Sequence, residues 1–319
     1  MSKPTSQKNH MGQLTVGVIL VVSSLVFGQG CTTLAKSDTT NNPATNGEIA
    51  QSDGNHGGNH QDMPSHEQDH APGDADHNQH NSGSASFQAK LTVAQTIGIN
   101  KPVTLAIDIQ DAAGKPQANF ETFQEKLMHL IAVSDDLEVF DHLHPEYKGN
   151  GRFEVTATFP KPGNYTMFAD YKPAGNREEI SVLKTSVSGP VARLDANESA
   201  SQYKKVFGNT EVNLDLGTAP IKSGADVMFK FDLRDTATSQ GVTLQPYLGE
   251  LGHLVIVKAS PNLTAADYLH AHAHTMGNTA AGEVHFMTHF PQPGKYKMWG
   301  QFNRDGKIIT ADFWVNVVE

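Results

Sequence analysis

The chain has 319 residues, enough for about two ordinary domains, and its single cysteine excludes an internal disulfide framework and a cysteine-based zinc site. Its 24 basic and 34 acidic residues give a net charge of −10, which argues against nucleic acid as a partner. Residues 32–86 alone hold one lysine and eight acidic residues, so the rest of the chain is nearly neutral. This balance also disfavours a protein that binds membranes by electrostatic attraction.

The N-terminal segment indicates export. Lys3 and Lys8 precede an apolar run from Leu14 to Phe27, and Cys31 follows shortly afterwards. A basic start, a short apolar segment and small residues are typical of an export signal, and the run would span only about 21 Å as a helix. The lone cysteine resembles the bacterial lipoprotein signal, in which Cys31 becomes the lipidated first residue and ties the protein to a membrane. An uncleaved anchor and simple secretion are the alternatives, and each places the protein outside the cytoplasm, in the cell envelope or periplasm.

Residues 32–86 lack hydrophobic periodicity and hold almost no large apolar side chains, so we expect a disordered linker. The linker carries six histidines among Asp and Asn, namely His56, His60, His66, His70, His77 and His80. Such tracts bind divalent metals weakly, although a solvated spacer is the alternative. His66 and His70 also match the HExxH protease motif, but no apolar face supports the helix that this motif requires.

The remainder of the chain is an internal repeat. Each copy has an apolar segment with a histidine near its start, then a His-x-His pair, then a Phe-Pro-x-Pro-Gly-x-Tyr-x-Met block. The histidines are His129, His142 and His144 in the first copy, and His253, His270 and His272 in the second. Two copies of about 100 residues indicate a tandem pair of domains. The expected segments are 1–31 (signal), 32–86 (disordered histidine-rich linker), 87–187 (first domain), 188–208 (interdomain linker) and 209–319 (second domain).

Each copy is expected to be all β, because apolar and polar residues alternate, as at Val103, Leu105 and Ile107, and turn signals recur at short intervals. The Pro-Gly-x-Tyr block resembles the tyrosine corner of immunoglobulin domains, which implies that Met167 and Met298 face the core. We therefore predict two tandem Ig-like Greek-key β-sandwiches. The expected strands are 88–95, 102–110, 128–133, 138–141, 152–159, 164–171 and 178–187, then 210–216, 226–233, 253–258, 267–270, 283–290, 295–303 and 308–318.

Strand direction predicts where the repeated histidines meet. One strand runs away from the end of the sandwich that holds His129 and the next returns, which brings His142 and His144 to the same end, with Asp170 and Tyr171 nearby. The second copy predicts a separate trio of His253, His270 and His272. Imidazole clusters suit Cu(II), Zn(II) and Ni(II), and copper leads the affinity order. Two flanking thioethers, at Met128 and Met276, would soften a site for Cu(I).

Over residues 87–187 and 209–319 the chain resembles the extracytoplasmic Ig-like metal-binding domains of the YtkA-like and CopC-like kind. That resemblance implies a cupredoxin-like sandwich that handles metal, chiefly copper. We therefore predict a membrane-anchored protein that buffers copper or passes it to a partner protein, with zinc as the alternative ion. The alternative functions are an Ig-like envelope interaction or structural module with incidental histidines, and a zinc-scavenging lipoprotein. The sequence has no GxSxG elbow and no glycine motif that binds phosphate, so we do not expect an enzyme.

Overall fold

The computed structural model describes residues 87–190, 203–274 and 279–319, and within them the side chains of His272 and His274 are not described. The expected signal with Cys31, the histidine-rich linker and most of segment 188–208 lie outside the described residues. The described part is built from strands, with one short 3-10 turn, η1 (Ala265–Asp267). None of its helical structure is long and apolar enough to span a membrane.

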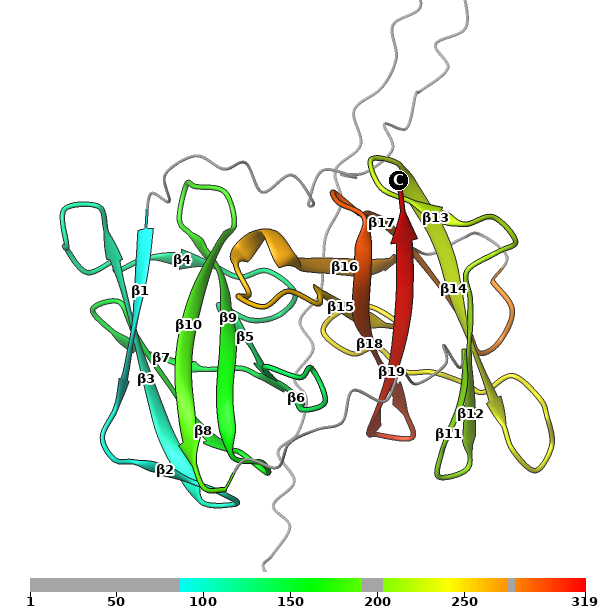
Figure 1. The fold of residues 1–319 in the computed structure, drawn as a ribbon, viewed down its shortest axis with the longest axis horizontal. Coiled ribbons are helices and arrows are strands. Elements are labelled where there is room, and N and C mark those ends of the chain that lie inside the picture. The colour runs from blue at the N-terminus through cyan, green and yellow to red at the C-terminus, as the bar shows by residue number, and fades with distance from the viewer. Residues whose placement is uncertain (1–86, 191–202, 275–278) are drawn as a thin grey trace, which may run out of the picture. The chain divides into compact units, whose positions relative to one another are not determined.

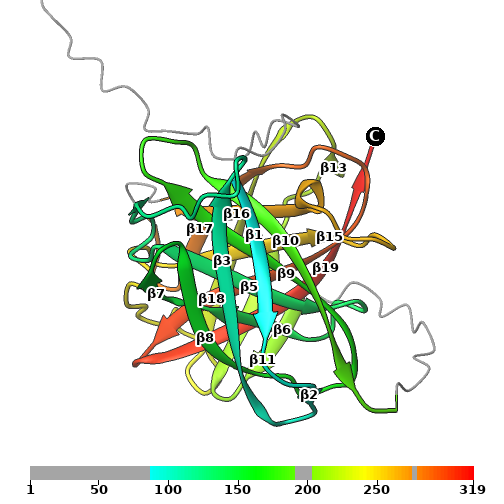
Figure 2. The same cartoon turned by 90° about the vertical axis from the view of Figure 1, so that its left-hand side faces the viewer.

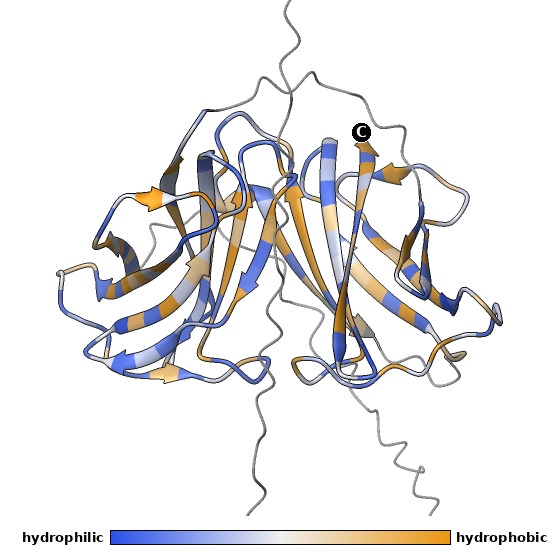
Figure 3. Cartoon of the chain, turned by 90° about the horizontal axis from the view of Figure 1, so that it is seen from below, coloured by the Kyte–Doolittle hydropathy of each residue, from blue (hydrophilic) through white to orange (hydrophobic). Residues whose placement is uncertain are grey.

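The first half of the described chain is a sandwich of two sheets (Figures 1 and 2). One sheet has the order β1 (Phe87–Val93), β3 (Pro102–Asp111), β8 (Arg152–Thr158), β7 (Glu146–Gly149). The other has the order β2 (Ile97–Gly98), β10 (Glu179–Ser188), β9 (Gly163–Pro173), β5 (Met128–Ser134), β6 (Phe140–Leu143), and β4 (Phe120–Glu121) pairs with β9. Apolar and polar residues alternate along strands such as β3, so that the apolar side chains point between the two sheets (Figure 3). Together they form one apolar core.

The second half repeats these two layers, but its strands form one continuous hydrogen-bonded ladder. The order is β11 (Lys204–Phe207), β12 (Thr210–Asp215), β14 (Asp226–Asp235), β17 (Glu283–His289), β16 (Tyr268–His274), β15 (His253–Lys258), β18 (Gly294–Arg304), β19 (Lys307–Val318), β13 (Ile221–Lys222). The ladder is continuous because β16 pairs with β15 along most of its length and with β17 at Ala273 and His274. A second apolar core lies between the layers.

The predicted all-β, Ig-like sandwich architecture is confirmed, and each expected strand overlaps an observed one. The strand expected at 138–141 begins later, at Phe140, because a turn at Leu137 with φ of 57° reverses the chain first. The strand expected at 267–270 extends to His274. The short strands β2, β4, β7, β11 and β13 were not predicted, since two to four residues carry too little alternation to detect.

Both tyrosine corners are present. The Tyr165 hydroxyl donates to the carbonyl oxygen of Lys161 at 3.0 Å, and the Tyr296 hydroxyl donates to that of Gln292 at 2.7 Å. Met167 and Met298 are fully buried in the two cores, as the resemblance implied.

The corner hydrogen bonds should contribute measurably to stability. We expect Tyr296→Phe and Tyr165→Phe each to lower the free energy of unfolding by about 0.5–1.5 kcal/mol, because each removes the hydrogen bond that a buried tyrosine makes. Chemical denaturation with each variant measures this. A loss below the error of the measurement for both variants would contradict a structural role for the corner.

A third apolar cluster joins strands of the two halves within the compact unit Asp69–Glu319. It combines Ile131, Val133, Leu137 and Phe168 with Val255, Val257, Leu263, Tyr268 and Trp299. Two aromatic pairs stack across it: Phe140 on Trp299 and Phe168 on Tyr268, each with ring centroids 4.8 Å apart. Phe140 and Tyr268 each begin a His-containing strand, so the duplication places corresponding residues in both pairs. The two halves therefore contact each other through equivalent faces.

Candidate functional site

Strand β5 is buried on both faces, and this decides where His129 lies. Met128, Leu130 and Ala132 belong to the core of the first half, whereas Ile131 and Val133 belong to the cluster that joins the halves. Since side chains alternate along a strand, His129 shares the face of Ile131 and Val133. It is fully buried there.

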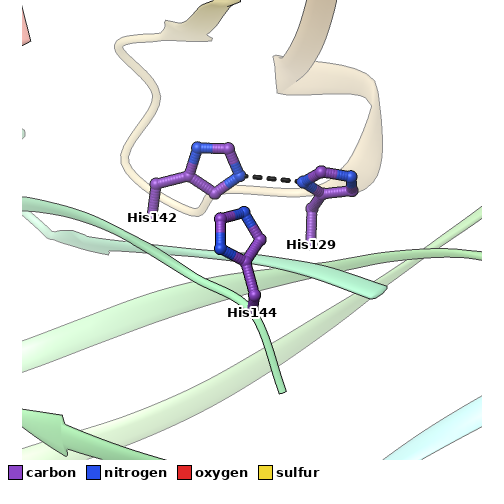
Figure 4. Close-up of side chains that lie close together, drawn as sticks. All are labelled: His129, His142 and His144. Carbon is purple, nitrogen blue, oxygen red and sulfur yellow. Dashed lines mark hydrogen bonds between the residues drawn. The ribbon is translucent and has the colours of Figure 1, made fainter. Parts of the chain in front are cut away.

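The neighbouring strand β6 brings two more histidines to the same place. His142 pairs with Ile131 in the register, and His144 follows directly after Leu143, which pairs with Leu130. His142 and His144 are half-buried. Figure 4 shows the three rings turned toward one another. Their ring centroids lie 5.2 Å apart for His129–His142, 5.2 Å for His129–His144 and 4.7 Å for His142–His144.

The second half contributes His253 and His270 from β15 and β16. His270 pairs with Val255 in the register, and His253 shares the face of Val255 and Val257 toward the first half. Both side chains are buried, and their ring centroids are 4.3 Å apart. The His253 ring lies 4.7 Å from that of His142 and 5.7 Å from that of His129.

These five imidazoles thus form one cluster where the halves meet, which we call the histidine cluster: His129, His142, His144, His253 and His270. The prediction of two separate trios is corrected, because β5 and β15 each turn their histidine away from the core of their own half. His272 lies opposite His253 in the strand register, but its side chain is outside the described residues.

Of the other residues expected near the histidines, one reaches the cluster and two do not. Asp170, which pairs with His129 across β5 and β9, does reach the cluster and lies 3.0 Å from Nδ1 of His270. Tyr171 faces the first core and its hydroxyl bonds to Ser181, so it is not part of the cluster. Met128 is buried in that same core, on the opposite face of β5 from His129, and supplies no thioether. Met276 is outside the described residues.

Acceptor oxygens lie beside the ring nitrogens of His129 and His142 that point away from the other imidazoles, which we call their outer nitrogens. Nε2 of His129 lies 3.3 Å from the carbonyl oxygen of Phe123, and Nδ1 of His142 lies 2.7 Å from Oε1 of Gln301. The amide nitrogen of Gln301 donates to the Thr310 hydroxyl at 3.3 Å, which leaves its oxygen to accept. In a neutral imidazole one nitrogen donates and the other carries a lone pair, so the outer nitrogens of His129 and His142 hold the protons.

The inner nitrogens are consequently without protons, and they face each other. Nδ1 of His129 lies 3.0 Å from Nε2 of His142. Nε2 of His144 is buried and has no hydrogen-bond partner among the described residues. The three residues offer ligand atoms that all lie within 4.8 Å of one another.

Burial keeps these imidazoles neutral. It lowers the pKa of His129 to about 2, helped by repulsion from His270, His142 and His144. Burial, then repulsion from His144, lowers the pKa of His142 to about 3. The pKa of His144 falls to about 4 because of burial and the nearby Lys126. At neutral pH the lone pairs are therefore available to a metal ion.

Two glutamines in the site were missed by sequence reasoning. Gln301 on β18 corresponds to Asp170 on β9, since each pairs with the first histidine of its half. Gln124 lies in a tight turn with a left-handed φ of 47°, and its Oε1 is 2.6 Å from Nε2 of His253. A non-glycine residue in that conformation often marks a functional site, but the sequence gives no sign of the φ.

Comparisons with solved structures give only weak likenesses. The native conformation of Escherichia coli alpha-2-macroglobulin is 15% identical over 73% of this chain and 14% of that chain, with a TM-score of 0.25. The tetra-tandem repeat from the extending region of a large adhesion protein is 9% identical over 74% of this chain and 50% of that one, with a TM-score of 0.25. Invasin, a bacterial integrin-binding protein, is 11% identical over 73% and 39%, with a TM-score of 0.21.

This chain covers less than two thirds of the length of each of these proteins, so their activities are not carried over to it. No curated protein matches the chain. A family model does match, and it matches twice, at residues 84–187 and 204–319, which together exceed half of the chain. The chain belongs to the family described as Domain of unknown function (DUF8832).

Proposed function

We propose that this protein binds a divalent transition-metal ion through the histidine cluster, with His129, His142 and His144 as the first ligands. One observation carries the proposal: inner nitrogens of His129 and His142 lie 3.0 Å apart while their outer nitrogens face the oxygens of Phe123 and Gln301, which can only accept. Two lone pairs at that distance repel unless a cation lies with them. The lowered pKa values disfavour a proton there, which leaves a metal ion.

The outer contacts are those that metal-binding histidines make. Such residues donate their second ring N–H to a carbonyl, an amide oxygen or a carboxylate, which orients the ring and strengthens the ligand. With metal–nitrogen bonds of about 2.0–2.1 Å, rings placed tetrahedrally around an ion have centroids about 5 Å apart. The spacings of 5.2, 5.2 and 4.7 Å support this arrangement.

Copper is the ion we propose first, with zinc as its rival. The donors are imidazole nitrogens, which suit Cu(II) and Zn(II), and copper stands above zinc in the affinity order. Met128 faces away from the cluster, so the described residues offer the cluster no soft thioether that would favour Cu(I). Colorimetric competition with both ions decides between them.

The biological setting remains as the sequence suggested it: a protein outside the cytoplasm, held by a lipid on Cys31, that buffers the ion or passes it to a partner protein. His129 is fully buried, whereas His142 and His144 are half-buried. An ion would therefore enter and leave on the side of His142 and His144. A transfer partner would have to approach there.

The test is a titration of the full chain with Cu(II) and with Zn(II). The six linker histidines are first replaced by Asn, so that the linker does not contribute; we call this variant the background variant. We expect the background variant to bind the ion tightly. Adding His142→Gln and His144→Gln should weaken binding by at least about 100-fold, because both substitutions remove a ligand. Loss of a hydrogen bond to a ligand already lowers metal affinity by about 10–100-fold. His285→Gln with His289→Gln, on half-exposed β17 positions, is the matched control and should change nothing.

The alternative functions make opposite predictions. If the domains are an interaction module with incidental histidines, the background variant binds neither ion more tightly than micromolar. If the protein scavenges zinc through its linker, binding disappears when the linker histidines are replaced and is unaffected by His142→Gln.

A further inference from the structure

The outer surface of the second half carries two methionines on neighbouring strands. Met228 on β14 pairs with Met287 on β17 in the register. Their neighbours Phe229 and Phe286 belong to the core, so both methionines lie on the opposite, outward face of the sheet. Met228 is 50% exposed, and Met287 is half-buried. Paired residues on one face have Cβ atoms about 4.5–5.5 Å apart, and each sulfur is two bonds further out, so both thioethers can contact one ion.

Two histidines flank Met287 on the same face. His285 and His289 each lie two residues from Met287 along β17, and both are half-buried. Residues two apart on a strand are separated by about 7 Å, which long side chains span. We call these four residues the methionine face: Met228, Met287, His285 and His289.

The charges around the methionine face favour a cation at His289 over one at His285. Asp226 pairs with His289, and its Oδ1 lies 3.2 Å from Nδ1 of that ring. An ionised carboxylate only accepts, so Nδ1 holds the proton and Nε2 carries the lone pair, as in metal-binding histidines. Lys230 pairs with His285 instead, and its ammonium group opposes a cation there, although Glu283 offsets part of that charge.

The equivalent face of the first half has none of these donors. Thr104 on β3 pairs with Thr156 on β8 at the positions of the two methionines, and β8 contains no histidine. Threonine is a residue that exposed strands favour, because its branched side chain packs well against cross-strand neighbours. The same fold therefore forms without the methionine pair, and packing does not account for it.

We propose that Met228, Met287 and His289 bind a soft monovalent metal ion, for which Cu(I) is the probe. Thioethers are soft ligands that select Cu(I). The methionine face offers less to a divalent ion, because His285 and His289 are about 13 Å apart along the strand and cannot both bind one ion. The site shares no residue with the histidine cluster, so it does not depend on the proposed function.

The experiment uses a full-length chain from which competing copper ligands have been removed. Cys31→Ser, His142→Gln and His144→Gln are added to the background variant, and we call the product the face variant. It is loaded with Cu(I) under ascorbate without oxygen and dialysed against the chelator bicinchoninate, and copper per chain is measured. We expect one Cu(I) to remain. That ion should be lost after Met228→Leu with Met287→Leu, which removes both sulfurs and conserves volume.

Single changes on β17 separate the proposed ligand from its neighbour. His289→Gln should lower the affinity for Cu(I) by at least about 10-fold, since even the loss of a hydrogen bond to a ligand costs 10–100-fold. His285→Gln is the matched control, because it lies on the same strand and equally far from Met287. It should leave the affinity nearly unchanged. Equal losses for the two variants would overturn the assignment of His289.

The methionine site would be overturned if the face variant retained no copper, or if the retained copper were unaffected by Met228→Leu with Met287→Leu. Neither outcome bears on the histidine cluster, which the Cu(II) and Zn(II) titrations test separately. X-ray absorption at the copper edge gives a second readout. Sulfur neighbours are expected in the loaded face variant, whereas nitrogen and oxygen neighbours alone would contradict the proposal. Circular dichroism checks that each variant is folded.

Discussion

From His129 and His142 alone, the metal-free protein is expected to be less stable at pH 5 than at pH 7 by roughly 4 kcal/mol, about 2 kcal/mol from each. Their pKa values in the folded protein are about 2 and about 3, well below the ordinary 6.5. Below pH 6.5 the unfolded chain gains protons on these residues and the folded chain does not. The free energy of unfolding therefore falls as the pH falls, through the window between 6.5 and the folded pKa values.

The measurement is urea denaturation at several pH values between 7 and 5, with a chelator present. The double variant His129→Gln, His142→Gln should lose that part of the dependence, because these two titrating groups are gone while His144, whose pKa is also lowered, remains. His289→Gln is the matched control, because it replaces a histidine on β17 that is not part of the histidine cluster. A difference below about 1 kcal/mol between pH 7 and pH 5 would mean that these imidazoles are protonated in the folded state.

Binding of the ion should persist at pH 5 while the protein is folded, because the folded imidazoles gain protons only at lower pH. Protons compete with metal for the same lone pairs, so affinity for Cu(II) decreases with acidity even while the protein remains folded. Because the lowered pKa values delay protonation in the folded state, the loss at pH 5 should be smaller than for free imidazole, whose pKa is about 6.5.

The strands and the composition of each core could be predicted from the sequence. Alternation at Val103, Leu105 and Ile107 marks β3, and all three side chains are buried as expected. The Pro-Gly-x-Tyr block located β9 and β18 together with their hydrogen-bonded tyrosines. These features follow from local rules, in which periodicity and turn chemistry act within about ten residues.

The meeting of His129, His142 and His144 was also predictable, because strand direction brings them to one end of a sheet. What local patterns do not contain is the packing of one half on the other. That packing moves His253 and His270 into the same cluster as the first trio. It also selects Gln124 and Gln301 from several glutamines that look alike in the sequence.

The sequence does carry one signal of that packing. Residues Met128–Ser134 and His253–Val257 are apolar on both faces of their strands, and all of these side chains are buried. A strand with one face on its own core needs a second partner to cover the other face. The continuous apolar runs that hold both histidines therefore pointed to a partner surface, and the second half supplies it.

Trp299→Ala is the substitution we expect to be most damaging outside the ligands, with a loss of about 3–5 kcal/mol in the free energy of unfolding. Trp299 is 3% exposed, lies in the cluster that joins the halves and stacks on Phe140. Removing its ring leaves a cavity at the contact between halves. Denaturation monitored by the remaining tryptophan, Trp314, measures the loss.

Trp314→Ala is the matched control. Trp314 packs against the same cluster but is only partly buried, and its ring faces the ammonium groups of Lys295 and Lys297 at 4.6 and 4.9 Å. Its loss should cost less than about 3 kcal/mol, since a cation–ring contact is worth about 0.5–1 kcal/mol at the exposed Lys295 and about 2 kcal/mol at the buried Lys297. Equal losses for the two variants would contradict the importance of the buried contact.

Trp299→Ala should also weaken Cu(II) binding, although it removes no ligand. Trp299 lies two residues before Gln301 on β18, and the Gln301 amide holds His142. Once the halves separate even slightly, the outer contacts that cross between them lengthen, and losing such a contact typically costs 10–100-fold in affinity. Tyr296→Phe, on the same strand but in the core of the second half, should leave affinity unchanged. Unaltered Cu(II) affinity in Trp299→Ala would mean that the contact between halves does not position the ligands.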